Sequence, residues 1–204
     1  MTRLILIRHG CSTWNTAGRI QGWADPPLDD LGRQQARRLA GRVRLEAPVA
    51  FYTSPQRRAR ETAEVVGQAL GVPVLPDERL KEHGIGDLTG LMWEEVVEQY
   101  PDAARRWTEA QETLGVPGEE EVGSFQARVV AAFDDIVARH AEETVSVVTH
   151  GGVLGAFLNH LIGLQSRLFS PFRFGNGSLT IVEVNPLRPR IVLLNDTCHL
   201  EGEL

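Results

Sequence analysis

The chain has 204 residues, of which 42 % are hydrophobic and 24 % charged, and its formal net charge is −6. A chain of this length fits one domain, and we expect a core large enough to need no disulfide or metal for stability. Its Lys and Arg residues are scattered among acidic ones, which argues against nucleic acid or an anionic membrane as the main partner.

Cysteine usage and hydropathy favour an intracellular setting. Cys11 and Cys198 lie far apart in the sequence and indicate neither a disulfide framework nor a zinc site. We find no charged-then-apolar leader and no apolar run near the ~18 residues needed to cross a bilayer. We therefore expect a cytoplasmic protein.

The first half of the chain alternates predicted strands and helices. Residues 4–7 form a short continuous apolar run, typical of a strand buried on both faces, and residues 11–27 are predicted to form a loop. Apolar residues then recur at helical spacing from Asp29 or Asp30, both plausible caps, to about residue 43. Residues 49–52 are predicted as a strand. Ser54-Pro55 offers a cap and a first helical residue for a helix that ends at Gly71, and a short strand follows near residues 72–75.

The second half follows the same alternation after a less regular middle. Helices are predicted at 93–99 and 103–113, with a solvated acidic turn at 119–121, and Ser124 is predicted to cap a helix through residue 140. A buried strand at 145–148 precedes a helix through residue 162. Strands at 179–184 and 191–194 are expected to form a hairpin around Asn185-Pro186. This order predicts one α/β domain over residues 1–204, a three-layer α/β/α sandwich with a mostly parallel central sheet.

Two histidines follow predicted buried strands. His9 lies in the run Arg8-His9-Gly10, and His150 is followed by Gly151. In open α/β sheets, ligands bind beyond the carboxyl ends of the strands, and glycine lets a ligand approach the backbone closely. One such histidine would more often be structural, whereas two in matching contexts, one beside an arginine, indicate a binding site.

Arginines at the start of the helix after residue 53 point to an anion. Arg57, Arg58 and Arg60 lie in its first turns, where a positive charge opposes the helix dipole. Such residues are favourable if they face an anion that the helix amino-terminus also attracts. The alternative, a solvated basic face paired with Glu61 and Glu64, stays open for Arg57 and Arg60.

In order along the chain, these motifs resemble those of the histidine phosphatase superfamily, also called the phosphoglycerate mutase-like family. The resemblance covers nearly the whole chain, and it rests on Arg8-His9-Gly10 with Ser12, Trp14 and Asn15; Arg19, Gln21-Gly22, Asp25 and Pro27-Leu28; Ser54-Pro55, Arg58-Ala59 and Thr62-Ala63; Leu80, Glu82, Gly86, Leu88 and Gly90; and His150-Gly151-Gly152 with Asn176 and Ser178. It implies a phosphoglycerate mutase-like fold, in which we expect residues 86–123 to form a helical insertion over the active site.

The resemblance also implies residue roles. His9 would be the nucleophile that forms a phosphohistidine, and Glu82 the general acid that then activates water. Arg8, Arg58 and a charged His150 would bind the phosphoryl oxygens. The wider phosphate-binding set is expected to include Gly10, Ser12, Asn15, Gln21, Gly22 and Gly151. We expect no metal and no cofactor.

Cys11 stands where the family usually has an acidic residue. A thiol next to the nucleophile and near arginines could have a low pKa and be sensitive to oxidation. The alternative is that Cys11 simply fills space. Neither reading removes a group that the chemistry needs.

The predicted function is hydrolysis of a small phosphomonoester. The segment between Gly90 and Gly118 is short, which favours an open pocket and hydrolysis over a mutase reaction, although Arg105-Arg106 could resemble a mutase's substrate-binding arginines. A non-catalytic interaction module is a further alternative. Specificity is expected from residues 19–27 and 91–118, including Trp23, Trp93 and Trp107, and a homodimer is left open.

Overall fold

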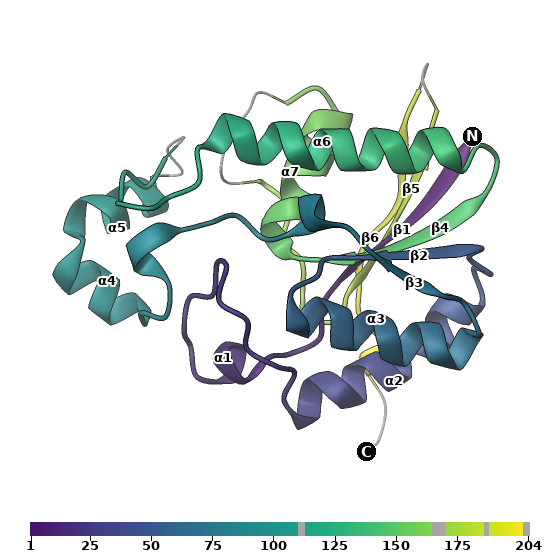
Figure 1. Cartoon of the computed structure of the whole chain (residues 1–204), viewed down its shortest axis with the longest axis horizontal. Coiled ribbons are helices and arrows are strands. Elements are labelled where there is room, and N and C mark those ends of the chain that lie inside the picture. Colours follow the sequence, from purple (N-terminus) through teal and green to yellow (C-terminus); the bar gives the residue numbers. More distant parts are fainter. Residues whose placement is uncertain (110–112, 165–169, 186–187, 202–204) are drawn as a thin grey trace.

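The structure is a computed structural model that describes residues 1–109, 113–164, 170–185 and 188–201. Its centre is a six-stranded sheet with the strand order β3-β2-β4-β1-β5-β6 (Figure 1). The strands are β1 (Thr2–Arg8), β2 (Ala50–Thr53), β3 (Val74–Pro76), β4 (Thr144–Thr149), β5 (Leu179–Val184) and β6 (Arg190–Asp196). Strands β1 to β4 run parallel to one another, and β5 is antiparallel to both its neighbours. The sheet is mostly parallel, as predicted.

Helices cover both faces of the sheet. Helices α6 (Val122–Arg139) and α7 (Gly151–Leu161) lie on one face, and α2 (Asp30–Arg44) and α3 (Arg57–Leu70) on the other (Figure 1). The side chains of β1 alternate between two hydrophobic cores, one on each face of the sheet. Leu4 and Leu6 pack under α6 and α7, and Ile5 and Ile7 pack under α2 and α3. This two-sided burial explains the continuous apolar run. The predicted α/β/α sandwich is confirmed.

The register of the sheet brings the predicted motifs to one edge. Arg8 of β1 is paired with Thr149 of β4, and Thr53 of β2 is paired with Val148. The residues that follow these strands, His9, Ser54 and His150, therefore emerge beside one another.

The helix after β2 begins later than predicted. Ser54-Pro55 does not start it, and α3 begins at Arg57 with no side-chain cap. The Ser54 hydroxyl lies 2.8 Å from Nε2 of His150, so it is engaged at the sheet edge. The predicted end at Gly71 is confirmed, because this residue has the left-handed φ of 69° that glycine favours.

Three other predictions of local structure are wrong. The predicted loop at 11–27 contains a one-turn helix, α1 (Thr13–Thr16), because Ser12 caps it. The cap of α6 is Glu121 rather than Ser124, since the Glu121 carboxylate accepts the amides of residues 123 and 124. The acidic run is therefore not a solvated turn, and Glu120 forms an ion pair with Arg128 at 2.7 Å.

The remaining elements complete the chain. Helices α4 (Trp93–Gln99) and α5 (Pro101–Thr108) lie to one side of the sheet (Figure 1) and pack around their own apolar cluster, which includes Leu88 and Val96. Single 3-10 turns occur at η1 (Glu78–Leu80), η2 (Gly86–Leu88) and η3 (Cys198–Leu200). The helix predicted at 103–113 begins earlier, at Pro101, and ends earlier, at Thr108, with Glu109 as its C-cap. The hairpin tip at Pro186 lies outside the described residues.

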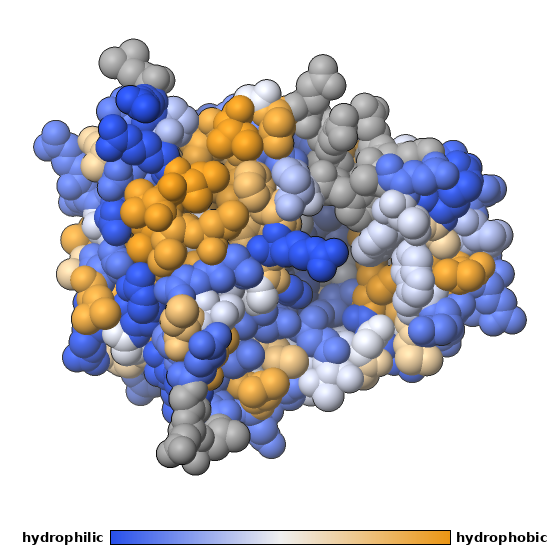
Figure 2. Space-filling view, turned by 180° about the vertical axis from the view of Figure 1, so that it is seen from behind, coloured by the Kyte–Doolittle hydropathy of each residue, from blue (hydrophilic) through white to orange (hydrophobic). Residues whose placement is uncertain are grey.

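Apolar and polar residues are mixed on the surface. The face shown in Figure 2 carries apolar patches between polar ones, and the edge strand β6 exposes Val192 and Leu194. Within the part of the chain that the structure describes, no helix is long and apolar enough to span a membrane.

Candidate active site

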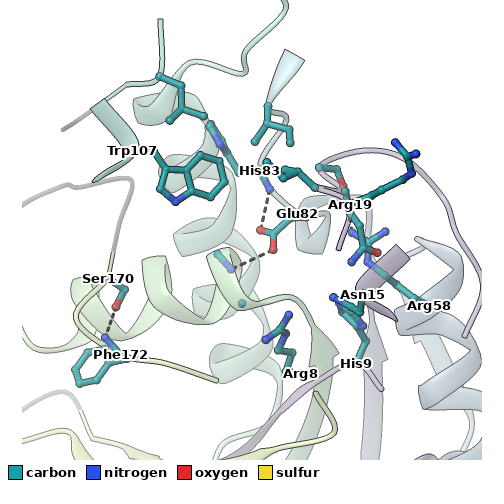
Figure 3. Close-up of a pocket in the computed structure, with 17 residues that line it drawn as sticks. Arg8, His9, Asn15, Arg19, Arg58, Glu82, His83, Trp107, Ser170 and Phe172 are labelled. Atoms are coloured by element: carbon teal, nitrogen blue, oxygen red, sulfur yellow. Dashed lines mark hydrogen bonds between the residues drawn. The ribbon is translucent and has the colours of Figure 1, made fainter. Parts of the chain in front are cut away.

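A pocket of about 420 Å³ opens at the carboxyl edge of the sheet. Four of the five residues predicted to be catalytic line it: Arg8, His9, Arg58 and Glu82 (Figure 3). They come from the end of β1, the start of α3 and the segment after η1. The sheet thus brings together side chains that lie more than 70 positions apart in the sequence.

His9 is held in one tautomer. Its Nδ1 lies 2.7 Å from the carbonyl oxygen of Gly10, and because a carbonyl only accepts, Nδ1 carries the proton. The lone pair is then on Nε2. Burial, followed by the charges of Arg58 and Arg8, holds the pKa of His9 well below its usual value. His9 is therefore a neutral imidazole with a nucleophilic nitrogen near pH 7.

Two arginines lie beside His9, Arg58 fully buried and Arg8 partly buried. The guanidinium of Arg58 donates to the carbonyls of Ala24 (2.7 Å) and Gly22 (3.1 Å), and Arg8 donates to the carbonyl of Phe174. The Nε–H of each arginine has no partner among the described residues. Burial lowers the pKa of Arg58 to about 10, so it stays charged at neutral pH. Two fixed cations with free N–H groups form an anion site.

His150 lies behind His9, with its ring centroid 5.2 Å from that of His9. Its side chain is fully buried, Nε2 contacts Ser54, and Nδ1 has no partner among the described residues. Burial and the charge of Arg58 lower the pKa of His150 well below its usual value. It is neutral in this state, so a charged His150 requires an anion to raise its pKa.

The carboxylate of Glu82 completes the site. Its Oε2 accepts the amide of Gly152 at 3.1 Å, and Oε1 accepts the amide of His83 at 2.9 Å (Figure 3). The Glu82 backbone amide donates to Oε1 of Gln56 at 2.7 Å. These contacts fix the carboxyl at the wall of the pocket, on the amino-terminal turn of α7.

The predicted phosphate-binding residues divide into two groups. Asn15, Gln21, Gly22 and Gly151 line the pocket. Gly10 and Ser12 lie behind it. A side chain at Gly10 would meet the backbone of Gly32, and Ser12 is fully buried, with its hydroxyl between Asn15 and Gln21. Gly10 and Ser12 support the residues that face the pocket.

The outer wall adds further residues. Ile20 and Leu114 lie in the two segments predicted to set specificity, 19–27 and 91–118. Sequence reasoning missed His83, Ile85, Ser170 and Phe172. His83 and Ile85 fall within the acid motif, between Glu82 and Gly86, whereas Ser170 and Phe172 follow no motif and are brought to the pocket only by the fold. Of the three tryptophans predicted to set specificity, Trp107 lines the pocket. Trp93 packs edge-on against Trp107, with 5.9 Å between the ring centroids. The indole N–H of Trp23 donates to the carbonyl of Glu82 at 2.8 Å.

Arg105 and Arg106, considered as substrate-binding residues, do not line this pocket. Arg105 pairs with Asp102 and Glu109 on its own helix. Arg57 and Arg60 pair with Glu61 and Glu64, as the alternative interpretation predicted. Among the described residues, no group of three or more His, Cys, Asp or Glu side chains could hold a metal ion.

Residues 4–197 match the model of the histidine phosphatase superfamily (branch 1). The chain is 36 % identical to phosphoserine phosphatase 1 of Hydrogenobacter thermophilus, over 98 % of this chain and 95 % of that protein. It is 36 % identical to the metal-independent phosphoserine phosphatase of Arabidopsis thaliana, over 99 % of this chain and 84 % of that one. Relatives named probable phosphoglycerate mutase GpmB, from Yersinia pestis, are 31 % identical over 90 % of this chain and 85 % of theirs.

Solved structures are also similar. YhfR of Bacillus stearothermophilus superposes with a TM-score of 0.91 at 37 % identity, covering 98 % of this chain and all of that one. A mycobacterial glucosyl-3-phosphoglycerate phosphatase superposes with a TM-score of 0.87 at 30 % identity, covering 96 % of this chain and 99 % of that one.

Proposed function

This chain belongs to branch 1 of the histidine phosphatase superfamily and is a phosphatase of that family, and we propose that its substrate is a small alkyl phosphomonoester, phosphoserine first of all. Two relatives that match almost the whole chain are phosphoserine phosphatases. A pocket of about 420 Å³ has room for a molecule of that size.

One observation carries the chemistry. The hydrogen bond from His9 Nδ1 to the carbonyl of Gly10 leaves Nε2 as a nucleophile, and the guanidinium groups of Arg8 and Arg58 line the same pocket. A neutral imidazole beside fixed positive charges is suited to attack a phosphoryl group. The three peripheral oxygens of the phosphoryl group carry negative charge, which the fixed positive charges stabilise.

In the proposed first step, the Nε2 lone pair of His9 attacks phosphorus and the bond to the ester oxygen breaks. Arg8, Arg58 and His150 hold the phosphoryl oxygens, and the protonated Glu82 carboxyl gives its proton to the leaving oxygen. The products are the free alcohol and a phosphohistidine.

In the second step, water attacks the phosphorus of the phosphohistidine. Glu82, now a carboxylate, takes a proton from that water while the P–N bond breaks. Inorganic phosphate leaves, and His9 and Glu82 return to their starting states. The two steps together form a complete catalytic cycle that uses His9, Glu82, Arg8, Arg58 and His150.

The test measures free phosphate released from phosphoserine and from a panel of other alkyl and sugar phosphomonoesters, in excess chelator. Phosphoserine is expected to give the highest kcat/KM of the panel, and His9→Ala is expected to abolish release. A panel member with a higher kcat/KM would overturn the substrate, and a fully active His9→Ala protein would overturn the mechanism.

The alternative is phosphoryl transfer within phosphoglycerate. The same assay with 3-phosphoglycerate present separates transfer from release. Because Arg105 and Arg106 do not line the pocket, release is expected to dominate. The cytoplasmic location and the homodimer stay predictions, as does a place for residues 86–123 over the active site.

A further inference from the structure

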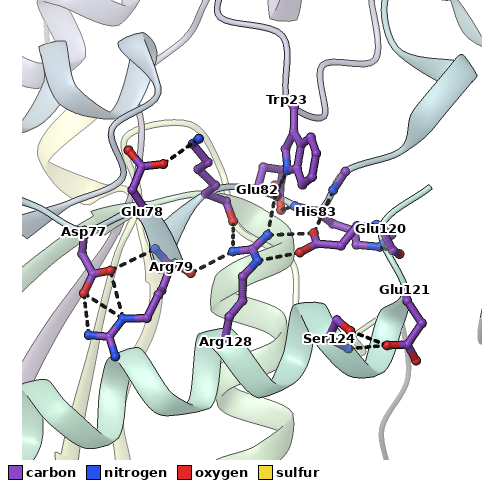
Figure 4. A network of polar contacts seen from close by, with 12 residues as sticks. Trp23, Asp77, Glu78, Arg79, Glu82, His83, Glu120, Glu121, Ser124 and Arg128 are labelled. Atoms are coloured by element: carbon purple, nitrogen blue, oxygen red, sulfur yellow. Dashed lines mark hydrogen bonds and ion pairs between the residues drawn. The ribbon is translucent and has the colours of Figure 1, made fainter. Parts of the chain in front are cut away.

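Arg128 is a partly buried arginine outside the pocket. It lies on α6, and its side chain is 19 % exposed and points toward the backbone that leads into Glu82 (Figure 4). Its neighbours on the helix, Phe125 and Val129, belong to the core. A cation in this position must be satisfied by hydrogen bonds, because burial without partners is costly.

Arg128 uses all five donors of its guanidinium. Two go to the Glu120 carboxylate, from Nε at 2.7 Å and Nη2 at 2.8 Å. The other three go to backbone carbonyls, those of Arg79 (2.8 Å), Lys81 (2.7 Å) and Glu82 (2.9 Å). A guanidinium has five N–H groups. None is left to bind a ligand, so the role of Arg128 is toward the protein itself.

The three carbonyls belong to the turn η1 and the two residues after it, the second of which is Glu82. All three carbonyl oxygens accept from the same guanidinium group, which fixes the backbone conformation from residue 79 to residue 82. Trp23 donates to the same Glu82 carbonyl at 2.8 Å from the other side. Without the cation, the carbonyls of Arg79 and Lys81 would lose this donor, and the carbonyl of Glu82 would keep only Trp23.

We call Arg128 and Glu120, with their hydrogen bonds to residues 79–84, the clamp. Glu120 forms the part of the clamp that lies past Glu82. Its carboxylate accepts the amide of Gly84 at 3.1 Å, its own amide donates to the carbonyl of Gly84 at 2.7 Å, and its carbonyl lies 2.8 Å from Nε2 of His83 (Figure 4). Arg128 therefore holds the backbone up to Glu82, and Glu120 holds the two residues after it.

We infer that Arg128 is a positioning residue for the Glu82 carboxyl, acting through the backbone of residues 79–84 together with Glu120. This inference rests on the proposed role of Glu82 as the general acid. A small rotation of this backbone would move the carboxyl away from the leaving oxygen, whereas His9, Arg8 and Arg58, on other elements, would keep their places.

A misplaced general acid has a specific kinetic signature. An alkoxide leaving group, such as that of phosphoserine, is a strong base that must be protonated as it departs. The p-nitrophenolate ion is a much weaker base and leaves without help. Loss of positioning should therefore slow alkyl phosphates far more than p-nitrophenyl phosphate, while simple loss of folded protein would slow both equally.

The test compares kcat/KM for the two substrates, because this parameter reports the step in which the leaving group departs. In Arg128→Met, the value for phosphoserine is expected to fall about 10- to 100-fold and that for p-nitrophenyl phosphate less than about threefold. Inhibition by inorganic phosphate should change less than about twofold. Arg128→Lys should recover only part of the loss, because an ammonium cannot reproduce the planar fork.

Arg42→Met is the matched control. Arg42 lies on α2, its side chain is 19 % exposed like that of Arg128, and it pairs with Glu46 and Asp196 rather than with the backbone before Glu82. It should leave the ratio of the two substrates unchanged. If Arg128→Met does not fold, Glu120→Gln weakens the same clamp with little change of shape and should move the ratio in the same direction. Equal losses for both substrates in the folded variant would overturn the inference.

Two outcomes concern the proposed function instead. If the wild-type enzyme prefers another alkyl phosphate, the substrate proposal fails and the comparison is made with that ester. If Glu82→Gln itself does not discriminate between the two substrates, the role of Glu82 fails. Discrimination by Glu82→Gln without discrimination by the Arg128 and Glu120 variants refutes the positioning role alone.

Discussion

The Glu82 carboxylate rests directly on Gly152, at the first turn of α7. Oε2 of Glu82 accepts the Gly152 amide at 3.1 Å, and a Cβ atom added to Gly152 would overlap Oε1. The absence of a side chain at residue 152 is what allows the carboxyl to approach the helix terminus. The second glycine of His150-Gly151-Gly152 is thus tied to the acid motif 70 positions earlier.

Gly152→Ala is expected to displace the Glu82 carboxyl, since the new Cβ cannot share its space. We expect kcat/KM for an alkyl phosphate to fall about 10- to 100-fold, because a displaced general acid loses part of its contribution to the rate. Steady-state kinetics with phosphoserine measures the effect. Gly41→Ala is the control, because a Cβ there meets nothing within 4 Å in the middle of α2. It should keep activity and add about 0.5–1 kcal/mol of stability. Wild-type kinetics in Gly152→Ala would contradict this account of the acid.

Stability should fall when the pH drops below the ordinary histidine pKa. His9 and His150 have pKa values well below 6.5 in the folded state because they are buried beside Arg58, so the unfolded chain binds more protons just below pH 6.5. Above that pH, both states are neutral and the effect is absent. Each histidine should lower the free energy of unfolding by about 1.4 kcal/mol per pH unit below 6.5, until its folded-state pKa is reached.

Urea unfolding between pH 7.5 and 5.5 measures this slope. His9→Asn removes one of the two groups and should reduce the slope by about one proton. The window stays above the range in which carboxylates titrate, so their lowered pKa values do not enter it. A flat profile from pH 7.5 to 5.5 would show that the buried histidines are not held neutral.

The sequence predicts the residues of the site better than the contacts that hold them. Parallel strands place their carboxyl ends together, so His9 and His150 could be expected at one edge from their local sequence alone. The sequence predicts a helix cap at Ser54 because serine before proline is typical of helix starts. Its contact with His150 joins residues 96 positions apart, and no local pattern reveals such a pair.

The sequence does not reveal the role of Arg128 for a related reason. Three of its five hydrogen bonds go to backbone carbonyls, and a backbone acceptor leaves no signal in the residue pattern. The one signal is that Arg128 adjoins Val129 and follows Phe125 by three positions, so it lies on the core-facing side of an amphipathic helix. A charged residue there needs a partner, and the structure supplies one in Glu120 of the acidic run.

Binding of a dianion should protonate His150. Its pKa is lowered by burial and by Arg58, and a bound dianion adds an opposing charge that favours the imidazolium. Sulfate is a suitable probe because it does not titrate near neutral pH. Calorimetric titration with sulfate at pH 7.5, in buffers of different ionisation enthalpy, should give uptake of up to one proton in a His9→Asn background. His150→Gln in the same background should abolish that uptake, and no uptake in either protein would mean that His150 binds the anion in its neutral form.

Cys11 is expected to be an unreactive thiol despite its position two residues after the nucleophile. Its side chain is buried, and burial raises its pKa above the usual thiol value, so little thiolate is present at neutral pH. Hydrogen peroxide should therefore leave phosphatase activity unchanged over the time in which an exposed thiol reacts, and Cys11→Ala should keep activity within about twofold. Cys198 provides the internal comparison because it is exposed. A thiol-specific chromogenic reagent should titrate one cysteine in the native enzyme and two after denaturation. Loss of activity in parallel with modification of Cys11 in the native enzyme would instead establish the thiol as an oxidation-sensitive group at the site.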